Sequence, residues 1–147
     1  MDERDLELRN VTYAAFVDLG RAPSVVEVAG IAGLDPAVVL DGWRRLHEAH
    51  AIVLQPGAAE IRMANPFSAV PTPHRVEAAG GSWYANCAWD AFGICAALDV
   101  DGRIETSCAD CGAALTVRVH RRRPDDESLV FHCLVPAARW WDDIGFT

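Results

Sequence analysis

The sequence predicts an α+β protein, with an N-terminal winged-helix-like three-helix module followed by a small mixed α/β core that has an antiparallel-type sheet. Three observations predict this class. Apolar residues recur at helical spacing through the first 50 residues. Short apolar runs bounded by glycine or proline occupy residues 51–63 and 101–136, as is typical of strands. Between these runs, WYANCAWDAFGICAAL is long and apolar enough to be the buried central helix of the core.

The N-terminal module is predicted to span residues 1–64. Apolar residues spaced along one helical face indicate a first helix over 3–19. Ser24, three residues before Glu27, forms a capping-box signature for a second helix that ends near Gly33. Asp35 and the proline that follows it open a third helix through His50, and the sequence AIVLQPGAAEIRM then predicts a hairpin. This order is that of a winged helix-turn-helix.

A proline-marked connector, NPFSAVPTPH, occupies residues 65–74 and separates this module from a core over 75–147. In the core we expect a strand in HRVEAAGG, a helix over 83–98, and strands in DGRIETSC, AALTVRVH and SLVFHCLVP. The residues Ile144 to Phe146 indicate the start of another apolar element. We therefore expect a short or truncated version of a longer fold.

Charge and composition exclude several classes of protein. The net charge of −8 opposes nonspecific binding to nucleic acid or to an anionic membrane. No apolar run is long enough to span a bilayer, and the charged start MDERDLELRN is unlike a secretory signal, so we expect a cytoplasmic protein without a membrane partner. The five cysteines are an odd number, which does not suit a closed set of disulfides, and we expect thiols.

The central stretch places Cys87 and Asp90 three residues apart, on one side of the expected helix. A thiol and a carboxyl held together disfavour double ionisation, so the pair tends to share one proton. Such a pair is both a soft metal ligand and a proton donor. The alternative is that Cys87 is a small core residue and Asp90 a solvated position at the helix edge.

The other cysteines allow several interpretations. Cys95 lies in a uniformly apolar setting and is expected in the core. Cys108 and Cys111 have the spacing of half a zinc knuckle, but a structural zinc needs two more ligands and no second C-x-x-C is present. They are structural-metal ligands, a relay that passes a metal ion on, or ordinary thiols of a turn. His47, His50 and His74 are expected to face solvent.

The run Tyr84-Ala85-Asn86-Cys87-Ala88-Trp89-Asp90 resembles the active-site helix of the organomercurial (alkylmercury) lyases, with their pattern Tyr-Ala-x-Cys-Ala-x-Asp. The segment ETSCADCGAALTVRV resembles the family's cysteine turn leading into a strand, in which the cysteine that matches Cys108 is structural. Near the end, LVPAARWWDD is similar to the family's Val-Pro-x-Ala-x-x-Trp segment.

The resemblance implies a lyase that cleaves a carbon–mercury bond by protonolysis. Cys87 then binds mercury, and Asp90 delivers the proton and contacts the metal. An apolar substrate pocket is expected from Trp83, Trp89 and Phe92, although aromatic residues in a helix are ordinary core in most proteins.

The family's second active-site thiol aligns near Asp126, where this chain has no cysteine. Cys133, on the corresponding strand, takes over that role or is an inward-facing core thiol. The resemblance implies no required cofactor, because mercury belongs to the substrate. The expected partners are a small organometallic substrate and, for product release, cellular thiols or a mercury-accepting protein.

Two other functions compete with the lyase. The first is a regulator in which the winged-helix module binds DNA, but residues 1–64 carry ten acidic residues against six arginines. The expected recognition helix offers only Arg44 and Arg45 as cations, so DNA is not expected as a partner. The second is a non-catalytic protein that binds mercury or zinc, which the missing second thiol favours.

Overall fold

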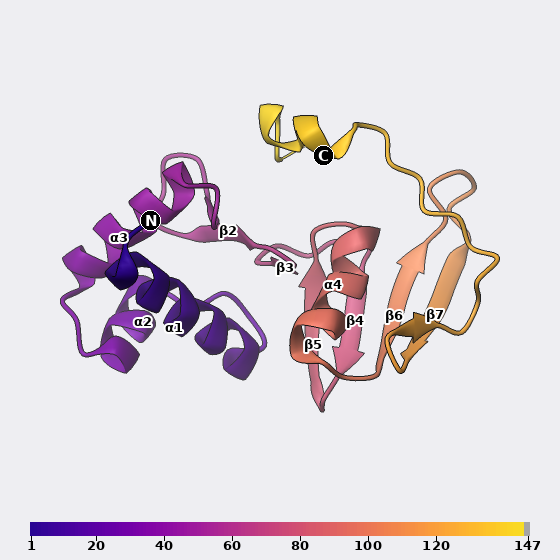
Figure 1. The fold of residues 1–147 in the computed structure, drawn as a ribbon, viewed down its shortest axis with the longest axis horizontal. Helices are drawn as coiled ribbons and strands as arrows, with labels where there is room; N and C mark the ends of the chain where they lie inside the picture. Colours follow the sequence, from indigo (N-terminus) through magenta and orange to yellow (C-terminus); the bar gives the residue numbers. More distant parts are fainter. Residues whose placement is uncertain (146–147) are drawn as a thin grey trace.

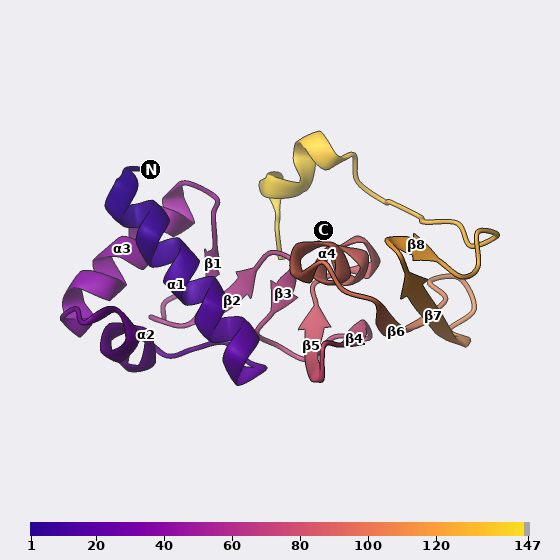
Figure 2. The same ribbon diagram turned by 60° about the horizontal axis from the view of Figure 1, so that its bottom comes forward.

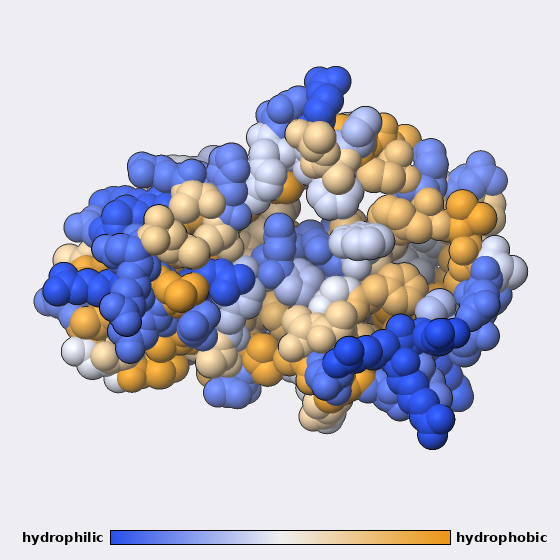
Figure 3. Space-filling view, viewed as in Figure 1, coloured by the Kyte–Doolittle hydropathy of each residue, from blue (hydrophilic) through white to orange (hydrophobic). Residues whose placement is uncertain are grey.

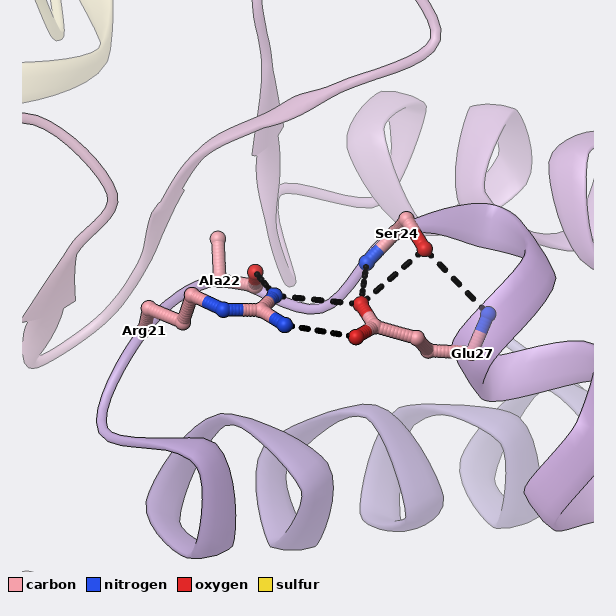
Figure 4. Close-up of polar contacts among 4 residues, drawn as sticks. All are labelled: Arg21, Ala22, Ser24 and Glu27. Atoms are coloured by element: carbon pink, nitrogen blue, oxygen red, sulfur yellow. Dashed lines mark hydrogen bonds and ion pairs between the residues drawn. The ribbon is translucent and has the colours of Figure 1, made fainter.

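The computed structural model describes residues 1–145. Three helices come first: α1 (Glu3–Leu19), α2 (Val25–Ala32) and α3 (Pro36–Glu48). All three were predicted within two residues of these bounds. The capping box of α2 forms as expected, since the Ser24 hydroxyl accepts from the backbone N–H of Glu27 and the Glu27 carboxylate accepts from the backbone N–H of Ser24 (Figure 4). Arg21 adds an ion pair to Glu27 at 2.6 Å.

The three helices pack around Trp43, which is fully buried. Its indole N–H donates to the hydroxyl of Thr12 at 3.0 Å, and that hydroxyl donates to the backbone carbonyl of Leu8 at 2.8 Å. The buried carboxylate of Asp5 accepts from Arg45, which lowers the pKa of Asp5. Helices α1 and α3 are therefore joined by polar contacts as well as by apolar packing.

The strands of the described residues form one eight-stranded antiparallel sheet, in the order β1-β2-β3-β5-β4-β6-β7-β8. Its bounds are β1 (Val53–Leu54), β2 (Ile61–Ala64), β3 (Phe67–Ser68), β4 (Arg75–Ala78), β5 (Gly81–Ala85), β6 (Gly102–Ser107), β7 (Ala114–His120) and β8 (Arg123–Pro124). The mixed α+β class predicted from the sequence is confirmed.

The hairpin predicted at residues 51–63 forms as β1 and β2, but these strands continue into the same sheet as the core, and the expected connector supplies β3. One apolar cluster includes Phe16 of α1, Phe67 of β3 and Ile94 of the central helix. The rings of Phe16 and Phe67 stack at 5.3 Å between centroids. The helical module and the core therefore share one hydrophobic interior.

The central helix is α4 (Ala88–Leu98), which lies on one face of the sheet (Figures 1 and 2). The predicted helix over 83–98 was wrong at its start, because Trp83 and Tyr84 belong to β5, which pairs with β3 and β4 on its two sides. A short apolar run such as this one fits a helix or a buried strand equally well. Its secondary structure depends on whether neighbouring strands pair with it.

The strand predicted over 128–136 was also wrong. Residues 125–136 form no regular element, and Val130 and Leu134 are 90% and 78% exposed. The chain leaves the sheet after β8, whose Pro124 has no N–H to donate, and Ser128 then turns back onto the carboxylate of Asp126. The segment arches over the start of α4 to the 3₁₀ helix η1 (Ala137–Asp142), where Trp141 stacks on His50 at 4.0 Å (Figure 1).

The apolar element expected from Ile144 to Phe146 cannot be placed, because Phe146 lies outside the described residues. Within residues 1–145, no helix has the length and apolar character needed to cross a bilayer.

Candidate functional site

Cys87 and Asp90 lie together at the start of α4. Cys87 has extended backbone angles and is the N-cap residue, and Asp90 is in the first helical turn. The N-cap residue and the third residue of a helix lie next to each other in space, although the Cys87 side chain makes no capping hydrogen bond. Each of the two groups shifts the pKa of the other, so the thiol and the carboxyl lie close together, and both side chains are half-buried. The sulfur and the carboxyl therefore share one small environment, as the sequence predicted.

Burial raises the pKa of the Cys87 thiol, and the Asp90 charge raises it further, while the backbone amides of Asp90 and Trp89 lower it. Burial also raises the pKa of Asp90. The neighbouring side chains of Asn86 and Cys87 lower it by a smaller amount. Both groups consequently hold their protons to higher pH than in water.

The sequence analysis did not identify Asn86 as a site residue. Its side-chain amide lies 3.0 Å from Asp90 Oδ2, 3.0 Å from Asn65 Oδ1 and 3.3 Å from the carbonyl oxygen of Pro66. The two N–H hydrogens of this amide are shared among these three acceptors. Asn86 therefore ties the Asp90 carboxylate to the turn between β2 and β3. It occupies the variable position of the family pattern, so the resemblance gave no signal for it.

Tyr13 of α1 extends this network. Its hydroxyl lies 3.1 Å from the carbonyl oxygens of both Ala51 and Asn65. Burial raises the pKa of Tyr13, with a smaller raising effect from the charge of Asp90. The helical module thus supports the turn that holds Asn86, a role that depends on contacts across 52 residues of sequence.

The three aromatic residues expected to form a pocket lie in different surroundings. Trp83 is on β5 and only 4% exposed, where it packs edge-on against Phe67. Phe92 is half-buried against the core. Trp89 is 59% exposed and packs on Phe131 of the C-terminal segment, with 5.8 Å between ring centroids. The surface is hollowed between that segment and the start of α4 (Figure 3).

Cys133 lies two residues beyond Phe131 and is exposed, and its thiol donates to the carbonyl oxygen of Val135 at 2.9 Å. Cys95 is buried, as expected. Cys108 and Cys111 lie on the turn between β6 and β7. Among residues 1–145, no three or more His, Cys, Asp or Glu side chains are grouped so that they could hold one metal ion.

The histidines differ from one another. His47 and His50 are exposed, as expected. His74 is half-buried, in contrast to the prediction, because its ring nitrogen Nδ1 lies 2.7 Å from the Thr106 hydroxyl between two strands. Burial lowers the pKa of His74, which favours the neutral ring.

Comparison with known proteins decides the family. A family model described as alkylmercury lyase (MerB) matches residues 67–147, which include the Cys87–Asp90 pair and the whole C-terminal segment. The chain belongs to the alkylmercury lyase family. A solved structure, the mercury-bound form of MerB2, has a similar fold with a TM-score of 0.66 and 21% sequence identity. The alignment covers 86% of this chain and 60% of that one, and no curated protein matches the sequence.

Membership of the alkylmercury lyase family agrees with the resemblance found in the sequence. The chain spans 60% of the length of the MerB2 structure. The family model begins at Phe67, on β3, so the helical module lies outside it. The MerB2 structure nevertheless covers most of the chain, which indicates that helices and sheet together form the shared fold.

Proposed function

We propose that this protein cleaves the carbon–mercury bond of organomercurials by protonolysis. The observation that carries the proposal is the placement of the Cys87 thiol beside the half-buried carboxyl of Asp90 at the start of α4. A thiolate is the protein ligand best suited to a soft metal such as mercury. A carboxyl with a raised pKa is suited to general acid catalysis near neutral pH.

The proposed reaction has two steps. Cys87 first displaces a thiol from R–Hg–SR′, so that a Cys87 Sγ–Hg bond forms and R′SH leaves with the thiol proton. The carbon–mercury bond then breaks, and its electron pair takes a proton from Asp90, giving RH. Mercury stays on the protein as Hg²⁺ bound to Cys87 and the Asp90 carboxylate until thiols remove it. Mercury is thus substrate and product rather than a resident cofactor.

The hollow under the C-terminal segment is the proposed place for the organic group. Trp89 at the start of α4 packs on Phe131 of that segment, and the Asn86–Asp90 hydrogen bond lies at the same helix start. Of the three aromatic residues proposed from the sequence, Trp89 is therefore the one that we expect to contact the substituent. Trp83 and Phe92 support the core behind it.

The test is to incubate the full chain with phenylmercury and excess small-molecule thiol, and to measure benzene by gas chromatography. Catalytic release of benzene, beyond one equivalent per chain, supports a lyase. Tight binding of phenylmercury without benzene would instead indicate a non-catalytic mercury-binding protein.

A DNA-binding regulator is disfavoured by the contacts of α3. Arg44 forms an ion pair with Asp41 at 2.9 Å, and Arg45 with Asp5 at 2.7 Å. Both cations of the expected recognition helix are therefore already paired within the protein. Phosphate binding would have to compete with these carboxylates.

Cys133 is proposed as the second thiol that helps to remove mercury from Cys87. The segment that carries it contacts the first turn of α4 through Phe131 and Trp89. We expect Cys133→Ser to slow benzene release when external thiol is limiting, because product then stays on Cys87. Excess external thiol should restore the rate. An equal loss at all thiol concentrations would contradict a role in product release.

Asn86 is proposed as a positioning residue for Asp90. Asn86→Leu should lower kcat for benzene release by about 10- to 100-fold, the usual cost of losing a side chain that orients a metal-site ligand. The hydrogen bond from Asn86 lowers the pKa of Asp90, so the variant should have a higher Asp90 pKa. The pH above which activity declines should therefore be higher in the variant than in the parent. The control is Asn10→Leu on the exposed face of α1. A lower rate with an unchanged pH profile would contradict this role.

A further inference from the structure

The turn between β6 and β7 holds two cysteines in a closed loop. The backbone N–H of Cys108 donates to the carbonyl oxygen of Ala113, and the N–H of Gly112 donates to the carbonyl oxygen of Cys108, both at 2.9 Å. Gly112 has φ +71°, a left-handed conformation that glycine adopts without a steric penalty. The pairing of Ser107 with Ala114 anchors both ends of the loop in the sheet. The backbone around the two cysteines is therefore fixed.

The two sulfurs of this turn are neighbours. Cys108 and Cys111 are three residues apart on one turn, which the hydrogen bond from the Gly112 N–H to the Cys108 carbonyl oxygen closes, so their side chains lie close together. Cys111 is exposed and Cys108 half-buried, so an ion can approach from solvent. The turn thus presents two sulfur ligands from a preformed loop.

The number of protein ligands at the turn distinguishes between zinc and mercuric ion. Structural zinc sites need four protein ligands in a tetrahedral arrangement. Within residues 1–145, no third His, Cys, Asp or Glu joins this pair in a metal-binding group. Hg²⁺ is satisfied by two thiolates, because it favours linear coordination by soft ligands. The pair is therefore suited to mercuric ion and poorly suited to zinc.

The turn lies at the same end of the sheet as Cys87. Strand β4 pairs antiparallel with both β5 and β6, so β5 and β6 run in the same direction. Cys87 follows the end of β5 and Cys108 follows the end of β6. The two strand ends are separated by β4 alone, which corresponds to about 10 Å. A metal ion released from Cys87 would therefore have only a short distance to diffuse to the turn.

We propose that Cys108 and Cys111 form a second mercury site, which binds Hg²⁺ as a bis-thiolate chelate. Binding exchanges ligands without any change of oxidation state: Hg(SR)₂ gives up two thiolates, which leave as RSH with the two cysteine protons, and two Cys Sγ–Hg bonds form. The site takes inorganic mercuric ion, so it does not depend on the proposed lyase activity.

The test uses the full chain carrying Cys87→Ser and Cys133→Ser, which leaves Cys95, Cys108 and Cys111. The reduced protein is titrated anaerobically with mercuric chloride in excess 2-mercaptoethanol, and near-ultraviolet thiolate-to-mercury absorbance and retained mercury are measured. We expect one mercuric ion per chain. Adding Cys111→Ser should weaken binding by about 100-fold or more, because the chelate becomes a single-thiol site.

The matched control is Cys95→Ala in the same background, which removes a buried thiol and should leave mercury binding unchanged. Since Cys111 is exposed, its substitution by serine leaves the fold intact, which circular dichroism checks. The proposal is overturned if the background variant retains no mercury, if Cys111→Ser binds mercury as tightly, or if zinc chloride competes on equal terms. Absence of benzene release in the lyase assay would leave this result unaffected.

Discussion

Cys87→Ser should abolish benzene release from phenylmercury. Serine keeps the size and the N-cap position of the side chain, but a hydroxyl is a hard, weak ligand for a soft metal ion. Without the Sγ–Hg bond, mercury is not held beside Asp90. The loss of rate should exceed the roughly 100-fold typical of removing an outer-shell partner of a metal site. Gas chromatography of benzene in excess thiol measures it.

The control for Cys87→Ser is Cys95→Ala, because Cys95 lies on the same helix but is buried away from the pair. This control should lose stability and keep turnover. Turnover that survives in Cys87→Ser would show that mercury is bound elsewhere, and the proposed reaction would then be wrong.

Asp90→Asn should lower benzene release by about 100- to 10,000-fold, the range expected for loss of a general acid. Asparagine still accepts from the amide of Asn86 through its own carbonyl oxygen, so the local geometry is kept. It has no carboxyl proton to deliver to carbon. One equivalent of phenylmercury should still bind at Cys87, as measured by retained mercury after gel filtration. Asp18→Asn, on the exposed side of α1, is the control.

The raised pKa of Asp90 also predicts how activity and stability depend on pH. Activity should fall as pH rises through this pKa, because the carboxyl proton is lost. Between its ordinary and its raised pKa, the folded state binds more protons at this position than the unfolded state, so the free energy of unfolding falls as pH rises. Asp90→Asn has no titrating carboxyl at this position, so it avoids this decrease in the free energy of unfolding. The variant should be at least as stable as the parent at neutral pH. A destabilised, active variant would contradict both expectations.

The N-terminal half could be predicted closely because its signals are local. The Ser24–Glu27 capping box and the proline at position 36 fix helix starts through contacts within four residues. The turn around Gly57 marks a hairpin in the same way. The nearness of Cys87 to Asp90 could also be predicted from the sequence, because residues three apart lie on one side of a helix, although the helix begins at Ala88 and not at Trp83.

The wrong predictions in the second half concern segments whose secondary structure depends on residues far away in the chain. Trp83 and Tyr84 fit a helix as well as a strand, and pairing of β5 with β3 and β4 makes them a strand. Leu129 to Leu134 have strand-forming composition, but beyond β8 no further strand follows in the described sheet. The spacing of apolar residues shows which face of a helix or strand is apolar. It does not show which other element packs against that face.

By itself, the sequence determined the helices of the first 50 residues, the α+β class, and the placement of the thiol and the carboxyl on one side of a helix. These depend on spacing and on backbone preferences that act over a few residues. Only the tertiary structure decided that Asn86 and Tyr13 support Asp90, that the helical module shares its core with the sheet, and that the turn with Cys108 and Cys111 lies at the same sheet end as Cys87. The reason is physical: contacts between residues far apart in the chain follow from how the elements pack, which local preferences do not encode.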